Sequence, residues 1–407
     1  MDDVRTIRGK AAVVGVGESD YTKHGQADEP EFKLLVRAVM RACEDAGVRP
    51  KEIDGFCSYA DDRNLPDRLS AALGIDELRL ANMHWTSGGG GSVAPVANAA
   101  AAIAAGYADC VVAYRGLAQG QFGRFGKAQV PRGGRRPANV SGYTGAGQYF
   151  GAAVAPYGVM SAASLYALRA TRMLEEHDVD PSVLEAVALA SYHHARSNPR
   201  SVMGGQALDH DTYVGSRWIA EPFRLYDCCQ ETDGAAAVVL VSAERARALR
   251  PDAAYLLGAA QGGDRRSGGT VENVPSYGGN FGAAATRLYR QAGLKPGDVD
   301  VAQLYDNFTG GVVFAIVEHG FCSWEDASDF ITFDNLIAPG GALPLNTSGG
   351  NIGEAYIHGF NLIVEAVRQL RGESPNQVPG AKVCLTAGGP MTPVVSTALL
   401  GTEETLG

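Results

Sequence analysis

Two distant segments of the chain repeat one pattern, and this internal repetition limits the folds that the chain can adopt. Residues 46–54 read Ala-Gly-Val-Arg-Pro-Lys-Glu-Ile-Asp, and residues 292–300 read Ala-Gly-Leu-Lys-Pro-Gly-Asp-Val-Asp. Each segment follows an apolar-periodic helix, has Gly where that helix ends and Pro soon after it, and leads into a strand. The repetition predicts two similar halves.

A second repeat extends the first. A helix expected over 92–105 is followed by a strand over 110–114, and a helix expected over 354–370 is followed by a strand over 383–387. The spacing is similar in both cases. Alternating helices and buried strands are typical of an α/β fold around a mixed sheet.

Each half also opens on a short apolar strand, at 11–16 and at 254–260. We therefore predict a first half over 1–250 and a second over 251–407. A long insertion at about 117–225 belongs to the first half, with helices expected near 162–176 and 181–198. Insertions of this length usually cover a site or form a subunit interface.

The composition excludes several classes of protein. The chain has 407 residues, is 45% apolar and carries a net charge of −10, which argues against a nucleic-acid surface. The apolar run near the start is too short to span a membrane. The seven scattered cysteines favour the cytoplasm. His193 and His194 have no metal-ligand partners at a suitable spacing, so no metal site is expected.

One local stretch is basic. Its residues are Arg124, Lys127, Arg132, Arg135 and Arg136. It is either a solvated loop or a contact for an anion, and the phosphates of a coenzyme A are a candidate ligand.

Two motifs carry a family resemblance. Residues 232–237 read Thr-Asp-Gly-Ala-Ala-Ala, and residues 346–350 read Asn-Thr-Ser-Gly-Gly. Together with the tandem halves they resemble the thiolase superfamily, especially its sterol-carrier-protein branch. The resemblance implies the thiolase fold: two βαβαβαββ halves in a layered αβαβα arrangement. It also implies that Ser348, Gly349 and Gly350 help to bind substrate.

The thiolase nucleophile is missing. Such enzymes carry a Cys at the N-terminus of the buried helix of the first half, where the helix dipole stabilises the thiolate. Here the position falls on Gly89, so Gly88, Gly89, Gly90 and, from the second half, Gly388 are predicted to line the substrate site. Ser87 or Ser92 is a conceivable substitute nucleophile, but Ser92 is better explained as a helix N-cap.

The second half departs from the family in the same way. Where thiolases have Gly-His-Pro, residues 353–359 read Gly-Glu-Ala-Tyr-Ile-His-Gly, so Tyr356 takes the place of the catalytic His and His358 lies two residues on. The second catalytic Cys aligns with Thr386. Cys384 is expected to be a small core residue.

A third motif contains another tyrosine. Residues 305–308 read Tyr-Asp-Asn-Phe where thiolases have a polar turn that holds the thioester oxygen. Tyr305 takes the polar position, and Phe308 is expected to pack. Two tyrosines thus replace two catalytic polar groups, unless they are ordinary half-buried residues of an inactive protein.

These features resemble a narrower group, the thiolase-like aldolases that degrade steroid side chains. The resemblance implies retro-aldol cleavage of a β-hydroxy acyl-CoA to a ketone and propionyl-CoA. It also implies a homodimer core, a DUF35 partner with an OB fold and zinc ribbon, and a heterotetramer. No cofactor is expected beyond the coenzyme A of the substrate. The alternatives are a non-catalytic thiolase-like protein that binds acyl-CoA or acts as a scaffold, and an atypical acyltransferase or thiolase.

A retro-aldol reaction needs a base for the β-hydroxyl proton and an oxyanion site for the enolate. We expect Tyr356 to handle that proton and Tyr305, with Asn307 nearby, to orient or protonate the enolate, although the roles could be exchanged. His358 is either the neighbour that assists Tyr356 or a core residue. Asp306 either accepts backbone amides or tunes Tyr305. Glu354 is either a first-turn helix charge or a catalytic group.

Overall fold

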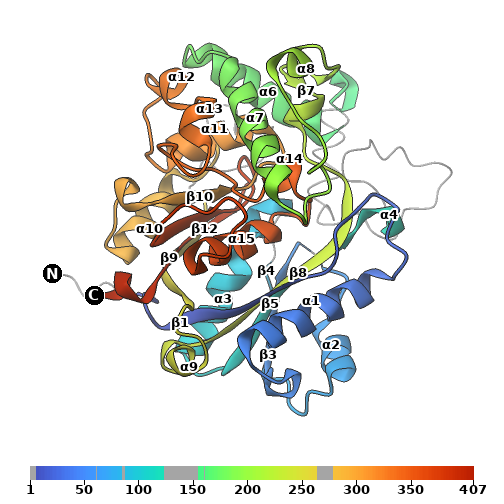
Figure 1. Cartoon of the computed structure of the whole chain (residues 1–407), viewed down its shortest axis with the longest axis vertical. Helices are drawn as coiled ribbons and strands as arrows, with labels where there is room; N and C mark the ends of the chain where they lie inside the picture. The colour runs from blue at the N-terminus through green and yellow to red at the C-terminus, as the bar shows by residue number, and fades with distance from the viewer. Residues whose placement is uncertain (1–5, 61, 85–87, 123–154, 160, 264–277) are drawn as a thin grey trace.

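The computed structural model describes residues 6–60, 62–84, 88–122, 155–159, 161–263 and 278–407 (Figure 1). One mixed sheet runs through the described part in the order β10-β11-β12-β9-β1-β8-β5-β3-β4, and β2 (Thr22–Lys23) pairs with β8 beside this path. The strands of the main path are β1 (Ala11–Glu18), β3 (Gly55–Tyr59), β4 (Leu80–His84), β5 (Cys110–Ala118), β8 (Thr232–Ser242), β9 (Ala254–Gly262), β10 (Val301–Leu304), β11 (Val383–Ala387) and β12 (Val395–Gly401). A separate hairpin pairs β6 (Trp218–Ala220) with β7 (Phe223–Arg224).

The sheet narrows where its two parts meet. β1 and β9 share only the pairs Ala12–Tyr255 and Val13–Ala254, whereas β1 pairs with β8 along its whole length. The proposed division of the chain at about residue 250 stays a prediction, because the strands on either side of it belong to one sheet.

Helices form layers on both sides of each part of the sheet (Figure 1). α3 (Ala94–Ala104) and α15 (Phe360–Arg371) share one apolar core with β1, β5, β8, β9 and β12, so they form the central layer. α1 (Glu31–Ala46) and α2 (Pro66–Leu73) cover the outer face of the first part. α10 (Gly282–Ala292) and α11 (Thr309–Glu318) cover the second. The predicted layered α/β architecture is confirmed.

The remaining described helices lie mostly beside α11, at the top of Figure 1. The two helices expected within the insertion are confirmed as α6 (Ala162–Glu176) and α7 (Ser182–Ser197), which share one apolar core with α11. The shorter helices are α4 (Gln119–Phe122), α8 (His210–Val214), α9 (Ala243–Leu249), α12 (Ala327–Phe330), α13 (Phe333–Leu336) and α14 (Gly350–Gly353).

The helix expected over 354–370 was placed wrongly at its start. α14 ends at Gly353, and α15 begins only at Phe360. Between them, His358 and Gly359 adopt left-handed φ angles of 56° and 87°, which an α-helix of L-residues does not tolerate. The apolar pattern of residues 354–370 continues through this break and therefore did not predict it.

The N-cap assigned to Ser92 is also wrong. α3 begins at Ala94, and Val93 occupies the cap position without a side-chain cap bond. Pro95 in the first turn fixes the helical φ angle and lacks the N–H that a cap would satisfy.

No helix among the described residues is long and apolar enough to cross a lipid bilayer.

Candidate active site

The two tyrosines singled out in the sequence meet in the structure. Their hydroxyl oxygens lie 2.8 Å apart, and their rings are nearly perpendicular, at 73°. Tyr305 directly follows β10 and donates its backbone N–H to Ala387 of β11. Tyr356 lies between α14 and α15, and its backbone N–H donates to Oγ1 of Thr232, at 2.9 Å. Two strands from different parts of the sheet, β11 and β8, therefore hold the backbones of the two tyrosines, and both tyrosine side chains are buried.

The ring of Tyr305 fills the position predicted for the missing cysteine side chain. A Cβ atom added to Gly89 would lie 2.1 Å from Cζ and 2.3 Å from the hydroxyl oxygen of Tyr305. A Cβ atom added to Gly359 would lie 2.3 Å from Cδ2 of the same ring. Because both distances are far below van der Waals contact, the ring requires glycine at both positions.

The other predicted glycines of this region lie in a tight turn or close against neighbouring backbone and side-chain atoms. Gly88, Gly89 and Gly90 lie in a 3-10 turn, η2 (Gly88–Gly91). A Cβ atom at Gly388 would lie 2.6 Å from the carbonyl oxygen of Gly90, and one at Gly90 would lie 2.0 Å from Oγ1 of Thr392. These contacts explain why the positions are glycine. Their role in substrate binding stays a prediction.

His358 lies beside the tyrosine pair. Its ring centre is 5.8 Å from that of Tyr356 and 6.3 Å from that of Tyr305. Tyr59 stacks on the imidazole at 5.4 Å and donates a 2.6 Å hydrogen bond to the carbonyl oxygen of His358. Burial, with the charges of Arg115 and Arg63, holds the pKa of His358 well below its usual value, so the imidazole is neutral.

Burial raises the pKa of both tyrosines well above the usual value. When Tyr305 donates the hydrogen bond between them, it lowers the pKa of Tyr356 and raises its own. Tyr356 is therefore the hydroxyl of the pair that accepts negative charge more readily. Neither is ionised at rest, so the pair can pass protons but cannot act as a standing phenolate.

Asp306 accepts backbone amides, as one of its two predicted roles required. Its carboxylate accepts from the N–H groups of Asn351 at 2.8 Å and Ile352 at 3.3 Å. Burial nevertheless raises the pKa of Asp306 to about 7. A Cβ atom at Gly350 would lie 2.2 Å from this carboxylate, and Gly350 has a φ angle of 63°, so this position also requires glycine.

Asn307 and Phe308 complete the turn. The carbonyl oxygen of Asn307 accepts a 2.9 Å hydrogen bond from the N–H of Cys229. Phe308 stacks on Phe223 at 5.2 Å and contacts Tyr166 at 4.9 Å, which confirms its expected packing role. The turn thus joins the tyrosine pair to the segment that carries Cys229.

Ser348 belongs to a second polar network, and Gly349 beside it packs closely against α7. The hydroxyl of Ser348 donates to Glu354 at 2.7 Å, and Asn198 and Asn361 donate to the same carboxylate at 2.8 and 3.0 Å. A Cβ atom at Gly349 would lie 2.8 Å from the Cβ atom of Ala195. The substrate-binding role of Ser348 and Gly349 stays a prediction.

The reading of Glu354 as a first-turn helix charge is wrong, because Glu354 directly follows α14 and five residues lie between it and the start of α15. It is buried, and burial together with the charge of Glu18 raises the pKa of Glu354 to about 7. Of its two predicted readings, the catalytic one stays untested.

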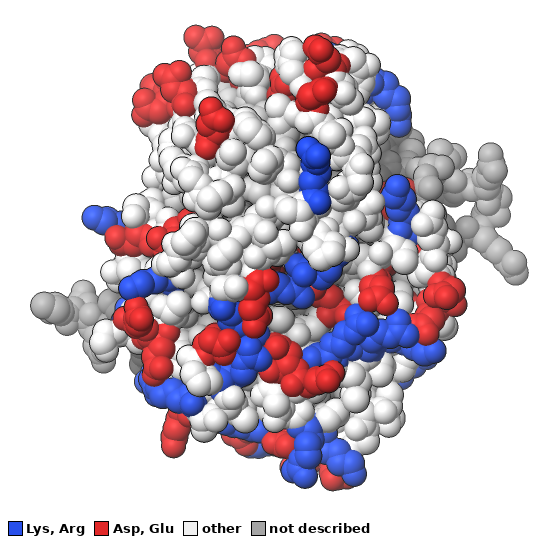
Figure 2. Space-filling view, viewed as in Figure 1, with Lys and Arg blue, Asp and Glu red and all other residues white. Residues whose placement is uncertain are grey.

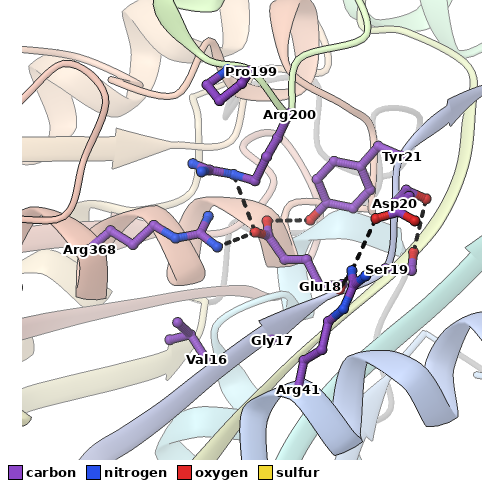
Figure 3. Close-up of a pocket in the computed structure, with 10 residues that line it drawn as sticks. All are labelled: Val16, Gly17, Glu18, Ser19, Asp20, Tyr21, Arg41, Pro199, Arg200 and Arg368. Atoms are coloured by element: carbon purple, nitrogen blue, oxygen red, sulfur yellow. Dashed lines mark hydrogen bonds and ion pairs between the residues drawn. The ribbon is translucent and has the colours of Figure 1, made fainter. Parts of the chain in front are cut away.

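A separate cavity of about 420 Å³ opens at the end of β1. Figure 3 shows Glu18 between the guanidinium groups of Arg200 and Arg368, with the hydroxyl of Tyr21 donating to it at 2.5 Å. Glu354 and Glu365 lie 3.8 and 3.9 Å from Arg200. Carboxylates therefore offset the charge of Arg200, and none of the predicted site residues lines this cavity.

The surface charges agree with the composition. On the face shown in Figure 2, Lys and Arg alternate with Asp and Glu across the lower half, and the described part of this face has no extended basic patch. The basic stretch that includes Arg124 and Arg136 lies outside the described residues, and so does Ser87.

The structure adds residues that the sequence did not single out. Leu117, Leu362 and Cys229 pack on the tyrosine pair. Nothing in the local sequence marks Cys229. Arg115, however, is a charged residue in the middle of the apolar strand β5, and that is a signal that was missed.

Ser92 is the other polar side chain near the pair. Its hydroxyl oxygen is buried and has no hydrogen-bond partner among the described residues. It would lie 3.3 Å from a Cβ atom at Gly359. No base contacts it in the described part of the chain, so nothing there activates it as a nucleophile. Cys384 is fully buried within β11, which confirms it as a core residue.

Comparison with known proteins connects this geometry to a family. The thiolase N-terminal domain matches residues 13–244, and the domain described as thiolase C-terminal domain-like matches residues 276–402. The chain is 40% identical to a 17-hydroxy-3-oxo-4-pregnene-20-carboxyl-CoA lyase of Mycobacterium tuberculosis, over 94% of this chain and 97% of the relative. It is 38% identical to a steroid side-chain-cleaving aldolase of Thermomonospora curvata, over 94% and 96% of the two chains.

A solved structure is also similar. A chain of the structure titled Ltp2-ChsH2(DUF35) aldolase superposes with a TM-score of 0.88 at 34% identity, over 98% of this chain and 99% of that one. Both thiolase domains and these near full-length relatives lead to one conclusion: the chain belongs to the thiolase family.

Proposed function

We propose that the chain is a carbon–carbon lyase that cleaves a β-hydroxy acyl-CoA by a retro-aldol reaction without a cysteine acyl-enzyme. The observation that carries this proposal is the ring of Tyr305 in the space of a side chain at Gly89, with its hydroxyl 2.8 Å from that of Tyr356. A thiolase needs a nucleophile at this place, whereas a retro-aldolase needs only proton transfer and a site for the enolate oxygen.

The hydrogen-bonded pair supports a proton relay. Either hydroxyl group can donate the bond between them, and the relay uses the arrangement in which Tyr356 is the donor. Tyr356 then takes the proton of the β-hydroxyl group while it passes its own proton to Tyr305, and Tyr305 gives its proton to the α-carbon. The bond between the α- and β-carbons breaks, its electron pair forms the enolate, and the β-carbon becomes a ketone. The proton lost from oxygen reappears on carbon, so no resting phenolate is needed. This fits the raised pKa of both tyrosines.

The other predicted residues have supporting roles in this proposal. Neutral His358 offers an imidazole lone pair beside the same hydroxyl groups. Asp306 fixes the start of α14, which precedes Tyr356, and Asn307 lies next to the turn that carries Tyr305. Gly88, Gly89, Gly90, Gly388, Ser348, Gly349 and Gly350 form the close-packed backbone around the thioester. We propose no cofactor beyond the coenzyme A of the substrate.

The names of the relatives narrow the substrate class. In 17-hydroxy-3-oxo-4-pregnene-20-carboxyl-CoA, which the Mycobacterium tuberculosis relative is named for, the 17-hydroxyl group is β to the thioester carbonyl. The α-carbon carries a methyl group. Retro-aldol cleavage of such a compound gives a 17-ketone and propionyl-CoA. We propose a steroid side-chain thioester of this kind as the substrate.

The partner is also a proposal. The similar solved structure has DUF35 in its title, which supports a DUF35 partner for this chain. We propose a homodimer core that binds two such partners in a heterotetramer.

The experiment that tests the function mixes the purified chain, with and without its DUF35 partner, with 17-hydroxy-3-oxo-4-pregnene-20-carboxyl-CoA. Mass spectrometry should detect the 17-ketone and propionyl-CoA in equal amounts. A chain with Tyr356→Phe is the matched control, because it differs by one hydroxyl group. If neither preparation forms products, the proposal fails, and a binding or scaffold role takes its place.

The acyltransferase alternative has its own readout. It requires a covalent acyl group on the protein, and Ser92, whose hydroxyl lies beside Gly359, is the candidate for that group. Intact-mass measurement after mixing with acyl-CoA should show no added acyl mass.

A further inference from the structure

A buried guanidinium lies behind the imidazole of His358. Arg115 comes from the middle of β5, and its side chain is 2% exposed. Its Cζ atom lies 5.1 Å from the ring centre of Tyr59, and the same ring stacks on His358, at a centre-to-centre distance of 5.4 Å, and on Phe360, at 6.3 Å. Arg115, Tyr59 and His358 therefore form a stack of guanidinium, phenol and imidazole.

The stack is held at each level. Nη1 of Arg115 donates to the carbonyl oxygen of Tyr59 at 2.8 Å and to Asp62 at 3.3 Å. The carboxylate of Asp62 also accepts from the N–H of Gly116 at 3.1 Å. The hydroxyl of Tyr59 in turn donates to the carbonyl oxygen of His358 at 2.6 Å. A positive charge is thus fixed at one end of the stack.

The hydrogen bond from Tyr59 to the carbonyl oxygen of His358 acts on a residue with a strained backbone. His358 has a φ angle of 56°, in the left-handed region that residues other than glycine rarely adopt. Such a conformation persists only where the surroundings enforce it. The hydroxyl of Tyr59 restrains the carbonyl group of this residue, and the ring of Tyr59 restrains the imidazole.

We propose that Arg115, acting through Tyr59, is a positioning residue that holds His358 in place and keeps its imidazole neutral beside the tyrosine pair. A protonated His358 has no lone pair to offer, so the charge of Arg115 preserves a proton acceptor at the site. The inference rests on the proposed function for the use of that acceptor, but the state of the imidazole can be measured without any substrate.

The charged and titratable groups around His358 are on several elements. Tyr59 and Arg63 come from β3 and the segment after it, Arg115 from β5, Tyr305 from the end of β10, and Tyr356 from its own segment. Arg63 is partly exposed and forms an ion pair with Glu31, so its effect on the imidazole is screened more than that of Arg115.

The test is an NMR titration of the imidazole in the whole chain with 13C-labelled histidine. The chain has 8 histidines, and His358→Gln identifies the signal. In the unaltered chain, His358 should stay neutral down to pH values well below those at which an exposed histidine titrates. The variant Arg115→Gln/Asp62→Asn removes both charges of the pair together. Its His358 signal should titrate at a higher pH, because the positive charge of Arg115 is gone. The shift should be smaller than the roughly one pH unit expected for the loss of one nearby charge at an effective dielectric of about 20, because the negative charge of Asp62 is removed as well.

Three further variants keep the inference falsifiable. Arg371→Gln/Asp45→Asn removes another ion pair with a fully buried arginine side chain and should leave the His358 signal unchanged. Arg115→Lys keeps the charge and should keep the low titration point. Arg63→Gln folds more safely, because its side chain is partly exposed, and should shift the signal less than the Arg115 variant does.

The inference is overturned if the Arg115 variant titrates like the unaltered chain, or if Arg63→Gln shifts the signal more. If the lyase assay succeeds, the acid limb of kcat/KM should move to higher pH in the Arg115 variant. Tyr59→Phe, which loses only the bond to the carbonyl of His358, should lower kcat with little change in KM. An unchanged kcat in Tyr59→Phe would reject the positioning role of the hydroxyl. A failed lyase assay with the expected NMR shifts would reject the proposed function and leave the inference standing.

Discussion

The ring of Tyr305 occupies the space that a side chain at Gly89 would need, because a Cβ atom at residue 89 would lie 2.1 Å from Cζ of the tyrosine. The two residues come from different halves of the chain. A nucleophilic side chain at residue 89 and a tyrosine at residue 305 are therefore mutually exclusive in this backbone. The loss of the thiolase cysteine and the presence of the tyrosine are one structural change.

This exclusion predicts coupled stability effects. Gly89→Ala should lower the free energy of unfolding by at least about 1–3 kcal/mol, the usual cost of overpacking. In a chain that already carries Tyr305→Ala, the same substitution should cost much less, because the ring is gone. Chemical denaturation of the four chains gives the coupling energy. Gly282→Ala, where a Cβ atom meets nothing within 4 Å, is the control and should change stability little. Additive effects would contradict the exclusion.

The hydroxyl pair predicts a loss of turnover with little loss of stability. Tyr356→Phe and Tyr305→Phe should each lower kcat by about a hundredfold or more, because each removes one proton-transfer step. The double variant should be little worse than either single variant, because the loss of one hydroxyl group already interrupts the relay. Tyr289→Phe removes another hydroxyl group whose oxygen is buried, on α10, and should leave kcat near normal. Near-normal turnover in Tyr356→Phe would disprove the relay.

The buried carboxyl groups predict a pH-dependent stability. Burial raises the pKa of Asp306 and of Glu354 to about 7, above the values of unfolded chains. The folded chain then binds more protons than the unfolded chain between about pH 4 and pH 7. The stability that these groups contribute is present at low pH and is lost as the pH rises through about 7, at up to about 1.4 kcal/mol per pH unit for each proton.

Glu354→Gln tests this slope. The amide of the new glutamine stays neutral at all pH values. It can donate a hydrogen bond to Oδ1 of Asn361 once the side-chain amide of Asn361 has flipped, because this Oδ1 atom has no described partner. Denaturation between pH 5 and pH 8 should show a smaller loss of stability than in the unaltered chain. Glu244→Gln, at an exposed position of α9, should keep the original slope. An identical slope in the Glu354 variant would show that this carboxyl group does not carry the effect.

Ser92 should be dispensable for cleavage. Its buried hydroxyl has no described partner, so Ser92→Ala removes an unsatisfied polar group and should leave stability equal or slightly higher. Turnover of the steroid thioester should stay within about threefold, because a group that changes the barrier by under about 1 kcal/mol is not a catalytic nucleophile. A large fall in kcat, together with loss of an acyl adduct in the intact mass, would instead support the acyltransferase alternative.

The resemblance to the thiolases was enough to predict that Tyr305 and Tyr356 belong to one site, because both tyrosines stand where that family has catalytic polar groups, and the structure brings their hydroxyl groups together. The sequence did not predict the break before α15, since the apolar pattern runs on through the two left-handed residues His358 and Gly359. It also did not predict Cys229, which reaches the tyrosine pair through tertiary packing alone. Arg115 was detectable in principle, because a charge within a buried strand needs a structural reason.

The narrow junction between β1 and β9 has a consequence for how the chain could be divided. In the sequence, both tyrosines and His358 come after β9, while Gly89, Tyr59 and Arg115 come before it. A C-terminal fragment that starts just before β9 would carry the reactive hydroxyl groups without the residues that enclose them. Two co-expressed fragments should therefore regain activity only when they reassociate along the central helices α3 and α15, and neither fragment alone should act as an enzyme.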